Sequence, residues 1–134
     1  MSQENVDIVL GMIDAYNSGD ADVALAFFTP DVDVFPDALV FPEASVLHGR
    51  EEFRAWIEEI ASAWRDVRWK EAEVRMVDDE VVLYRGEWGG TGIASGIETY
   101  SSITGLYTVR DELICRAEWF FDHAKALKAV GLGE

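Results

Sequence analysis

Two side chains of this 134-residue chain have the type and position needed to move protons near neutral pH. Asp37 follows the alternating segment DVDVF, where a predicted strand meets a loop, and a carboxylate that loses water among apolar groups has a raised pKa. His48 stands at the start of a predicted helix, and histidine titrates near neutral pH. Each has a simpler interpretation: Asp37 as a solvated loop carboxylate, and His48 as a lead into the helix, bonded to backbone.

Aromatic side chains supply the other half of a candidate site. The hydroxyls of Tyr16 and Tyr100 can bind a substrate oxygen, or they can be satisfied within a core. Five tryptophans, four tyrosines and seven phenylalanines are many for this length. Such rings often line ligand cavities, although they can equally fill a core.

Other chemistries lack their residues. His48 and His123 lie in different predicted elements, and Cys115 is the only cysteine, so neither a metal site nor a disulfide is predicted. The segment GTGIASG lies between predicted strands instead of before a helix, which excludes a dinucleotide-binding turn. We therefore expect no cofactor and no metal.

The elements that must position these residues follow from periodicity. Apolar residues recur at helical spacing over residues 3–17, 21–28 and 50–64. After Trp64 the period changes to two, which predicts an antiparallel meander over residues 67–77, 81–88, 97–110 and 112–121, besides an earlier strand over 31–35. A short helix follows Asp122 and stops at Gly131. Helices before a run of strands predict one α+β domain over residues 1–134, with a curved mixed sheet packed on helices.

The charge balance limits the partners. Twenty-six acidic residues against eleven basic ones give a net charge of −15, which opposes binding to nucleic acid and to anionic membranes. No apolar run approaches the roughly 20 residues of a membrane span, and the N-terminal segment lacks the basic region of a signal peptide. We expect a soluble, cytoplasmic protein.

The order and spacing of four stretches resemble the nuclear-transport-factor-2-like superfamily, in particular its SnoaL-like branch related to ketosteroid isomerase. The stretches are YNSGDADVALAFFTPDVDV (16–34), HGREEFRAWI (48–57), YRGEWGGTGIASG (84–96) and DELICRAEWFFDHAKALKAVGL (111–132). The resemblance implies a cone: a strongly bent sheet wrapped on a long helix, with an apolar cavity between them. It also implies a homodimer through the outer sheet face. The family includes isomerases, polyketide cyclases, dehydratases, epoxide hydrolases and non-enzymatic binding modules.

In such a cone, alternate strand residues face the cavity. The resemblance turns Ala117, Trp119 and Phe121 inward, and Arg116, Glu118 and Phe120 outward toward a partner subunit. The same alternation turns three residues of each of two earlier strands inward: Tyr84, Gly86 and Trp88, and then Tyr100, Ser102 and Thr104. We therefore expect one apolar cavity with Asp37 or His48 at its mouth, lined by Tyr16, Trp56, Tyr84, Trp88, Tyr100, Thr104 and Trp119.

A ketosteroid-isomerase-like site would need a carboxylate base, a helix tyrosine and a neutral acid on a later strand. Here Pro36 and Asp37 reverse the acid–proline order of the family, Met12 stands at the tyrosine position and Thr104 at the acid position. These departures favour a binding domain for a small apolar or polycyclic molecule. The alternative is an acid/base enzyme of isomerase, cyclase or dehydratase type.

Overall fold

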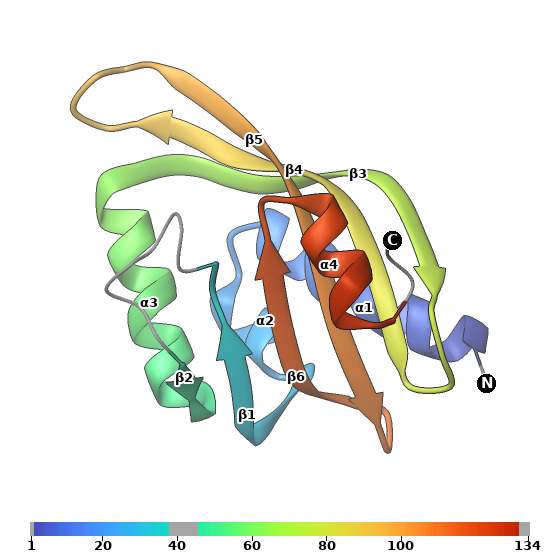
Figure 1. Cartoon of the computed structure of the whole chain (residues 1–134). Coiled ribbons are helices and arrows are strands. Elements are labelled where there is room, and N and C mark those ends of the chain that lie inside the picture. The colour runs from blue at the N-terminus through green and yellow to red at the C-terminus, as the bar shows by residue number, and fades with distance from the viewer. Residues whose placement is uncertain (1, 38–45, 132–134) are drawn as a thin grey trace.

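The structure is a computed structural model that describes residues 2–37 and 46–131. The loop predicted after Phe35 therefore lies mostly outside the described residues. Figure 1 shows one sheet with helices around it. The helices are α1 (Ser2–Asn17), α2 (Ala21–Leu25), α3 (Gly49–Ala63) and α4 (His123–Ala129); the strands are β1 (Phe28–Phe35), β2 (Leu47–His48), β3 (Trp64–Met76), β4 (Val81–Gly92), β5 (Glu98–Arg110) and β6 (Leu113–Phe120).

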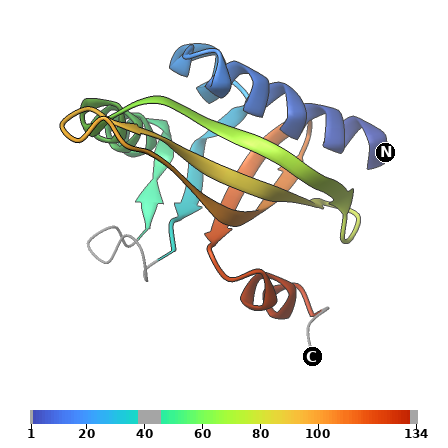
Figure 2. The same cartoon turned by 90° about the horizontal axis from the view of Figure 1, so that it is seen from above.

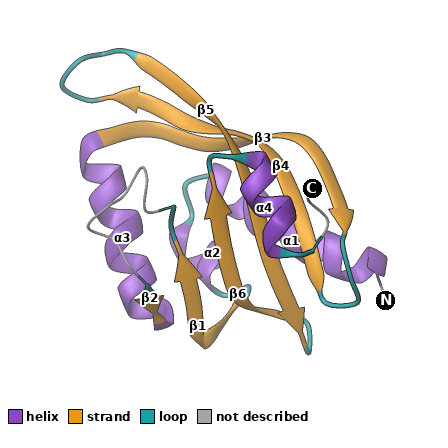
Figure 3. Ribbon diagram, in the orientation of Figure 1, coloured by secondary structure: helices purple, strands orange, loops and turns teal. Residues whose placement is uncertain are grey.

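The sheet is mixed and curved. Its strand order is β2-β1-β6-β5-β4-β3, and β1 runs parallel to β6 while the other neighbours are antiparallel. The meander from β3 to β6 is the predicted one, and the α+β fold is confirmed. Figure 3 shows how the long β4 and β5 reach beyond β6 and over α3.

Different helices cover the two faces of the sheet. Seen from above, α1 and α4 lie on opposite sides of the sheet (Figure 2). The inner face, toward α1 and α3, carries the larger core, which includes Val9, Ile57 and Tyr107. The outer face carries a smaller cluster, in which Leu83 and Leu106 pack with Ala126 of α4. A residue of the sheet therefore contributes to the interior only if its side chain points inward.

Helix α2 is shorter than predicted. It ends at Leu25, and Phe28 already belongs to β1 instead of to a helix over 21–28. The reason lies in the sheet, because the amide of Ile114 in β6 donates to the carbonyl of Phe27 at 2.8 Å. The guanidinium of Arg50 in α3 donates to the carbonyl of Phe28. Tertiary hydrogen bonds thus override local helix propensity here.

A β-bulge interrupts β3 near its start. Arg65 pairs with Thr91 and Arg68 with Gly89, so two residues, Asp66 and Val67, oppose Gly90 alone. Asp66 has a φ of 56°, which is unusual for a residue with a side chain. A Cβ on Gly90 would lie 2.8 Å from the carbonyl oxygen of Arg65. The glycine-rich segment between the predicted strands therefore belongs to β4 up to Gly92, and the lack of a side chain at Gly90 allows the bulge.

The register between β4 and β5 corrects one prediction. Trp88 pairs with Ser101, and Tyr84 with Gly105, and directly paired residues share a face. Ile103 and Tyr107 therefore face inward with Trp88. The prediction that Tyr100, Ser102 and Thr104 face inward is wrong, because the turn between the strands sets a register that differs by one residue and moves these side chains to the other face.

Candidate functional site

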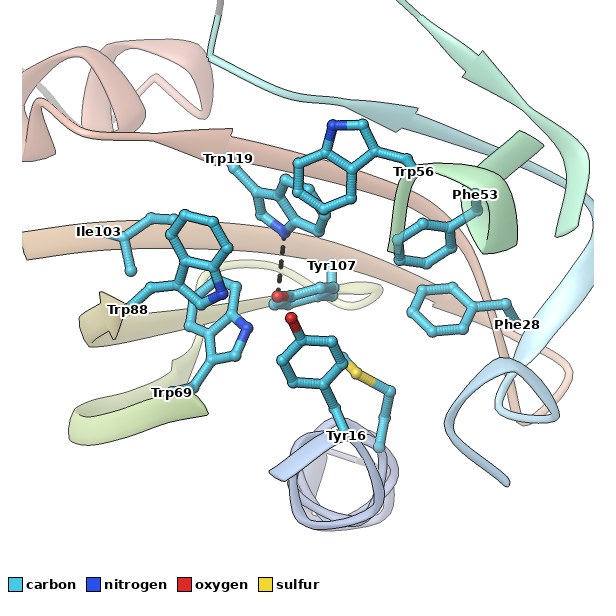
Figure 4. Close-up of a pocket in the computed structure, with 10 residues that line it drawn as sticks. Tyr16, Phe28, Phe53, Trp56, Trp69, Trp88, Ile103, Tyr107 and Trp119 are labelled. Atoms are coloured by element: carbon cyan, nitrogen blue, oxygen red, sulfur yellow. Dashed lines mark hydrogen bonds between the residues drawn. The ribbon is translucent and has the colours of Figure 1, made fainter. Parts of the chain in front are cut away.

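A cluster of rings fills the space between α1, α3 and the inner face of the sheet (Figure 4). Each element supplies it from its inward positions: α1 through Met12 and Tyr16 one turn apart, and α3 through Phe53 and Trp56. We call this cluster the ring pocket. It is lined by Met12, Tyr16, Phe28, Phe53, Trp56, Trp69, Trp88, Ile103, Tyr107 and Trp119.

The rings of this pocket touch one another. The centroids of Trp56 and Trp119 are 5.2 Å apart, and those of Phe28 and Phe53 are 5.1 Å apart in an edge-to-face arrangement. The remaining cavity measures about 20 Å³, room for little more than one water molecule. The rings therefore interdigitate as a core does, and the expected open cavity among them is not present.

More space lies beside the ring pocket, between the end of α3 and the extended part of β4 and β5. This mouth hollow measures about 170 Å³. It shares Trp88 with the ring pocket. Its lining consists of Ile60, Trp64, Val67, Trp88, Gly89, Gly90, Thr99, Ser101 and Phe121.

A third hollow, the side hollow, measures about 450 Å³ and lies where the end of α1 and the turn before α2 face α3 and the start of β3. It shares Tyr16 with the ring pocket, and Ile60, Trp64 and Val67 with the mouth hollow. The three spaces are therefore neighbours, and the mouth and side hollows both lie where α3 ends and β3 begins.

The hydroxyls of Tyr16 and Tyr107 and the indole N–H groups supply the polar atoms of the ring pocket. The Nε1 of Trp119 donates to the hydroxyl of Tyr107 at 3.1 Å, and the Tyr16 hydroxyl points toward the same place (Figure 4). Burial raises the pKa of Tyr16 to about 12, although a hydrogen bond with Trp88 partly offsets it. Burial also raises the pKa of Tyr107. Both hydroxyls stay neutral at physiological pH, so neither acts as a proton-accepting base there.

Four of the predicted binding residues meet in the ring pocket: Tyr16, Trp56, Trp88 and Trp119. Tyr84 is a neighbour on the same face, buried with its ring edge-on to Trp69 at 5.3 Å. The structure places the other two predicted binding residues, Tyr100 and Thr104, on the outer face, as the register between β4 and β5 requires.

Tyr100 and Thr104 lie on the outer face. The Nζ of Lys70 sits 3.9 Å from the centre of the Tyr100 ring. The hydroxyl of Thr104 is within 2.8 Å of Nδ1 of His123 in α4. Burial, followed by the positive charge of Arg85, lowers the pKa of His123. Thr104 and His123 thus connect β5 to α4, and Lys70 and Tyr100 contact each other on the outer face. None of these residues lines the ring pocket or the mouth hollow.

The two proton-transfer candidates also lie outside the three hollows. The carboxylate of Asp37 accepts a hydrogen bond from the amide of Phe121 at 2.8 Å, which ties the end of β1 to the end of β6. His48 lies at the edge of the sheet with its side chain 70% exposed, and its Nδ1 is 2.6 Å from Asp33. Neither group lines any of the three hollows.

Sequence reasoning missed several residues of the ring pocket. Ile103 and Tyr107 belong to an alternating apolar series in β5 that pointed to the correct face. Trp69 is directly paired with Trp88 across β3 and β4, which no local pattern reveals. Met12 occupies the position at which the family resemblance placed a tyrosine, and it does line the pocket.

No group of three histidine, cysteine, aspartate or glutamate side chains gathers within residues 2–37 and 46–131 as a metal site would need. In the same residues, no helix is long and apolar enough to cross a membrane.

The comparison with protein families now bears on this geometry. Residues 9–117 match the model of the SnoaL-like domain. The chain belongs to the SnoaL-like family. The match covers α3, the part of α1 from Val9 onward and nearly all of the sheet. No curated protein matches the chain.

Several solved structures share the fold of this SnoaL-like domain at low sequence identity. An NTF2-like protein of unknown function from Burkholderia pseudomallei is 20% identical, with a TM-score of 0.79 over 98% of this chain and 99% of that one. A candidate polyketide cyclase from Xanthomonas campestris pv. campestris is 19% identical, with a TM-score of 0.80 over 97% and 98%. A protein from Catenulispora acidiphila with a ketosteroid-isomerase-like fold, crystallised with trimethylamine, is 17% identical, with a TM-score of 0.75 over 93% and 92%.

Proposed function

We propose that this SnoaL-like domain binds a small, neutral, ring-containing molecule without transforming it. One observation carries the proposal: among residues 2–37 and 46–131, the aromatic interior contains polar hydrogen-bonding groups but no carboxylate, histidine or cysteine side chain. Tyr16 has a pKa of about 12, and the carboxylates and histidines that could transfer protons lie outside. A structural neighbour with a ketosteroid-isomerase-like fold was crystallised in complex with trimethylamine, which supports the view that this fold can bind a small organic molecule.

A binding experiment tests this proposal directly. Tryptophan fluorescence and amide chemical shifts are recorded while a set of neutral one-ring and two-ring phenols is added. We expect saturable changes at residues of the inner face, such as Trp88 and Ser101, and no product in the same samples. Shifts confined to the outer face, or no saturable change with any phenol, would remove the proposal.

An acid/base enzyme is the second candidate, and the position of Asp37 is the observation that favours it. Its carboxylate is fixed by the amide of Phe121, whose ring lies 6.3 Å from that of Trp88. Asp37 is thus hydrogen-bonded to Phe121, a residue that lines the mouth hollow. For this candidate, we expect wild-type protein to exchange the α-protons of a cyclic ketone for deuterium, and Asp37→Asn to lose that exchange. His48→Gln is the matched variant that should leave the rate unchanged.

We also infer that two copies pair through the outer face. The part of this face beyond α4 carries exposed charges of both signs, including Lys70, Arg85 and Glu87, which suits a self-complementary contact. Phe120, the apolar residue expected to drive the contact, packs instead against the cluster under α4. Light scattering should give twice the 15.0 kDa of the chain, whereas 15.0 kDa at micromolar concentration would contradict pairing.

A further inference from the structure

The ring pocket and the mouth hollow differ in volume, and this difference limits the size of a ligand. The ring pocket leaves about 20 Å³ and the mouth hollow about 170 Å³. An apolar cavity of about 150 Å³ is known to hold a benzene molecule, whereas about 10–15 Å³ holds one water. Of these two spaces, only the mouth hollow has room for a single ring, and there is no room among the deeper rings. The larger side hollow, of about 450 Å³, is lined by charged residues such as Glu58, Asp66 and Arg68, which suit a neutral apolar ring less well.

The walls of the mouth hollow suit a flat ring. Trp64 and Ile60, at the end of α3, form one side of it. Trp88 and Phe121 form another, with their rings 6.3 Å apart and edge-to-face. The bulge in β3 adds Val67. Aromatic walls of this kind bind flat apolar groups through offset or edge contacts.

Small polar groups complete the hollow. Ser101 pairs with Trp88 across the strands, so its exposed hydroxyl lies on the inner face. Thr99 lines the same space, together with Gly89 and Gly90. A hydroxyl or carbonyl group on a bound ring would find a hydrogen-bond partner here.

The hollow favours a ligand without charge. Its lining residues within the described part of the chain are apolar, aromatic, glycine, serine or threonine, so none of these offers a counter-ion. The net charge of −15 adds a long-range repulsion toward anions. Burying an unpaired ion in such a site is costly.

Trp88 separates the mouth hollow from the ring pocket, because it lines both. Its ring lies nearly parallel to that of Trp56, with centroids 6.3 Å apart and planes 18° apart. A longer ligand would have to displace this indole to reach Ile103 and Tyr107 behind it. The indole therefore stands as the end wall of the accessible space.

We propose that the mouth hollow is the binding subsite for one neutral flat ring bearing a hydroxyl or carbonyl group, and that Trp88 sets this size limit. The inference rests on the proposed binding function and adds the place, the size and the charge of the ligand.

Ligand-detected fluorine NMR tests the class of ligand on the full chain. Three probes are compared: para-fluorophenol, para-fluorobenzoate and a fluoronaphthol. Wild-type protein should bind para-fluorophenol, and should bind the benzoate and the naphthol at least about tenfold more weakly. Equal binding of the anion would contradict the charge argument, and equal binding of the naphthol would contradict the size limit.

A matched pair of serine variants tests the place. Ser101→Phe fills the mouth hollow from the inner face and should weaken para-fluorophenol binding at least about tenfold. Ser102→Phe introduces the same ring on the outer face, since Ser102 pairs with Glu87, and should leave binding unchanged. If both variants bind like wild type, the ligand sits elsewhere and the proposal is overturned.

Variants of Trp88 test the end wall. Trp88→Ala should join the two spaces and raise fluoronaphthol affinity at least about tenfold. Because removing a partly buried indole is costly, Trp88→Leu serves as the milder variant and should change affinity in the same direction. Unchanged size selection in a folded variant would contradict the role of Trp88. If no probe binds wild-type protein at all, the proposed binding function fails, whereas binding with a different size order or place removes only this inference.

Discussion

The two hydroxyls of the ring pocket explain at the residue scale why we favour binding over proton transfer. Tyr107 accepts a hydrogen bond from Trp119, and Tyr16 stays protonated because its pKa is about 12. A tyrosine in this state donates a hydrogen bond but does not remove protons near neutral pH. The sequence pointed to Tyr16 as a possible polar group of the interior, whereas Tyr107 was missed because β5 was assigned the wrong face.

The hydrogen bond between Trp119 and Tyr107 should contribute measurably to stability. Tyr107→Phe leaves the indole N–H of Trp119 without its acceptor in a buried site, which costs about 1–3 kcal/mol. Urea unfolding measures the difference. The matched variant Tyr100→Phe, on the outer face, should stay within about 0.5 kcal/mol of wild type. Equal losses in the two variants would contradict the assigned contact.

Buried tyrosines also predict how stability changes in alkali. The pKa of Tyr16 rises from 10.0 to about 12 on folding, so the unfolded chain loses this proton first. The contribution is complete below pH 10 and is lost as the pH rises toward 12. Tyr16→Phe should make the fall in unfolding free energy less steep across this window, by up to about 1.4 kcal/mol per pH unit. An unchanged slope in urea unfolding series would show that this hydroxyl ionises as readily in the folded state.

A single side chain fixes α1 to the edge strand at the scale of elements. The amide of Asn17 accepts from the backbone N–H of Trp69 at 2.8 Å and donates to its carbonyl at 2.9 Å. This side chain pairs with the backbone of β3 as a neighbouring strand would. The contact holds the end of α1, and with it Tyr16, against the strand that supplies Trp69.

Asn17→Ala should therefore loosen this end of the molecule. Two backbone groups of β3 lose their partners, which should lower the unfolding free energy by about 1–3 kcal/mol. Hydrogen exchange at Trp69 should also become faster. Ser18→Ala, which removes only a local bond to the carbonyl of Ala15, is the control. If exchange at Trp69 stays the same in Asn17→Ala, the contact does not hold the strand.

The elements show how far periodicity predicts this fold. The long helix from Gly49 to Ala63 and the meander from β3 to β6 follow from clear changes of period. The face assignment of β5 failed because the prediction followed a register that differs by one residue, and not the alternating apolar residues Ile103 and Tyr107. The prediction of a longer α2 failed for a different reason. The hydrogen bonds from Ile114 and Arg50 to the carbonyls of Phe27 and Phe28 come from residues far along the chain, so no local pattern records them.

The free space is a property of the whole molecule, and the sequence does not contain it in readable form. The sequence predicted an aromatic interior correctly from four elements, through Tyr16, Trp56, Trp88 and Trp119. Whether those rings enclose a cavity depends on their side-chain angles and on the curvature of the sheet, and here they close on one another. The larger volumes lie instead around the end of α3 and the bulge in β3, in the mouth hollow of about 170 Å³ and the side hollow of about 450 Å³.

If a neutral ring binds in the mouth hollow, as we claim, a heavy atom on that ring should be located there in a crystal. Crystals of the chain are soaked with para-bromophenol, and the bromine is located by its anomalous scattering. We predict a peak between Trp64 and Trp88, with the phenol hydroxyl near Ser101 and the deeper rings undisturbed. A bromine peak among the deeper rings with Trp56 displaced, or only on the outer face beside Tyr100, would contradict the claim.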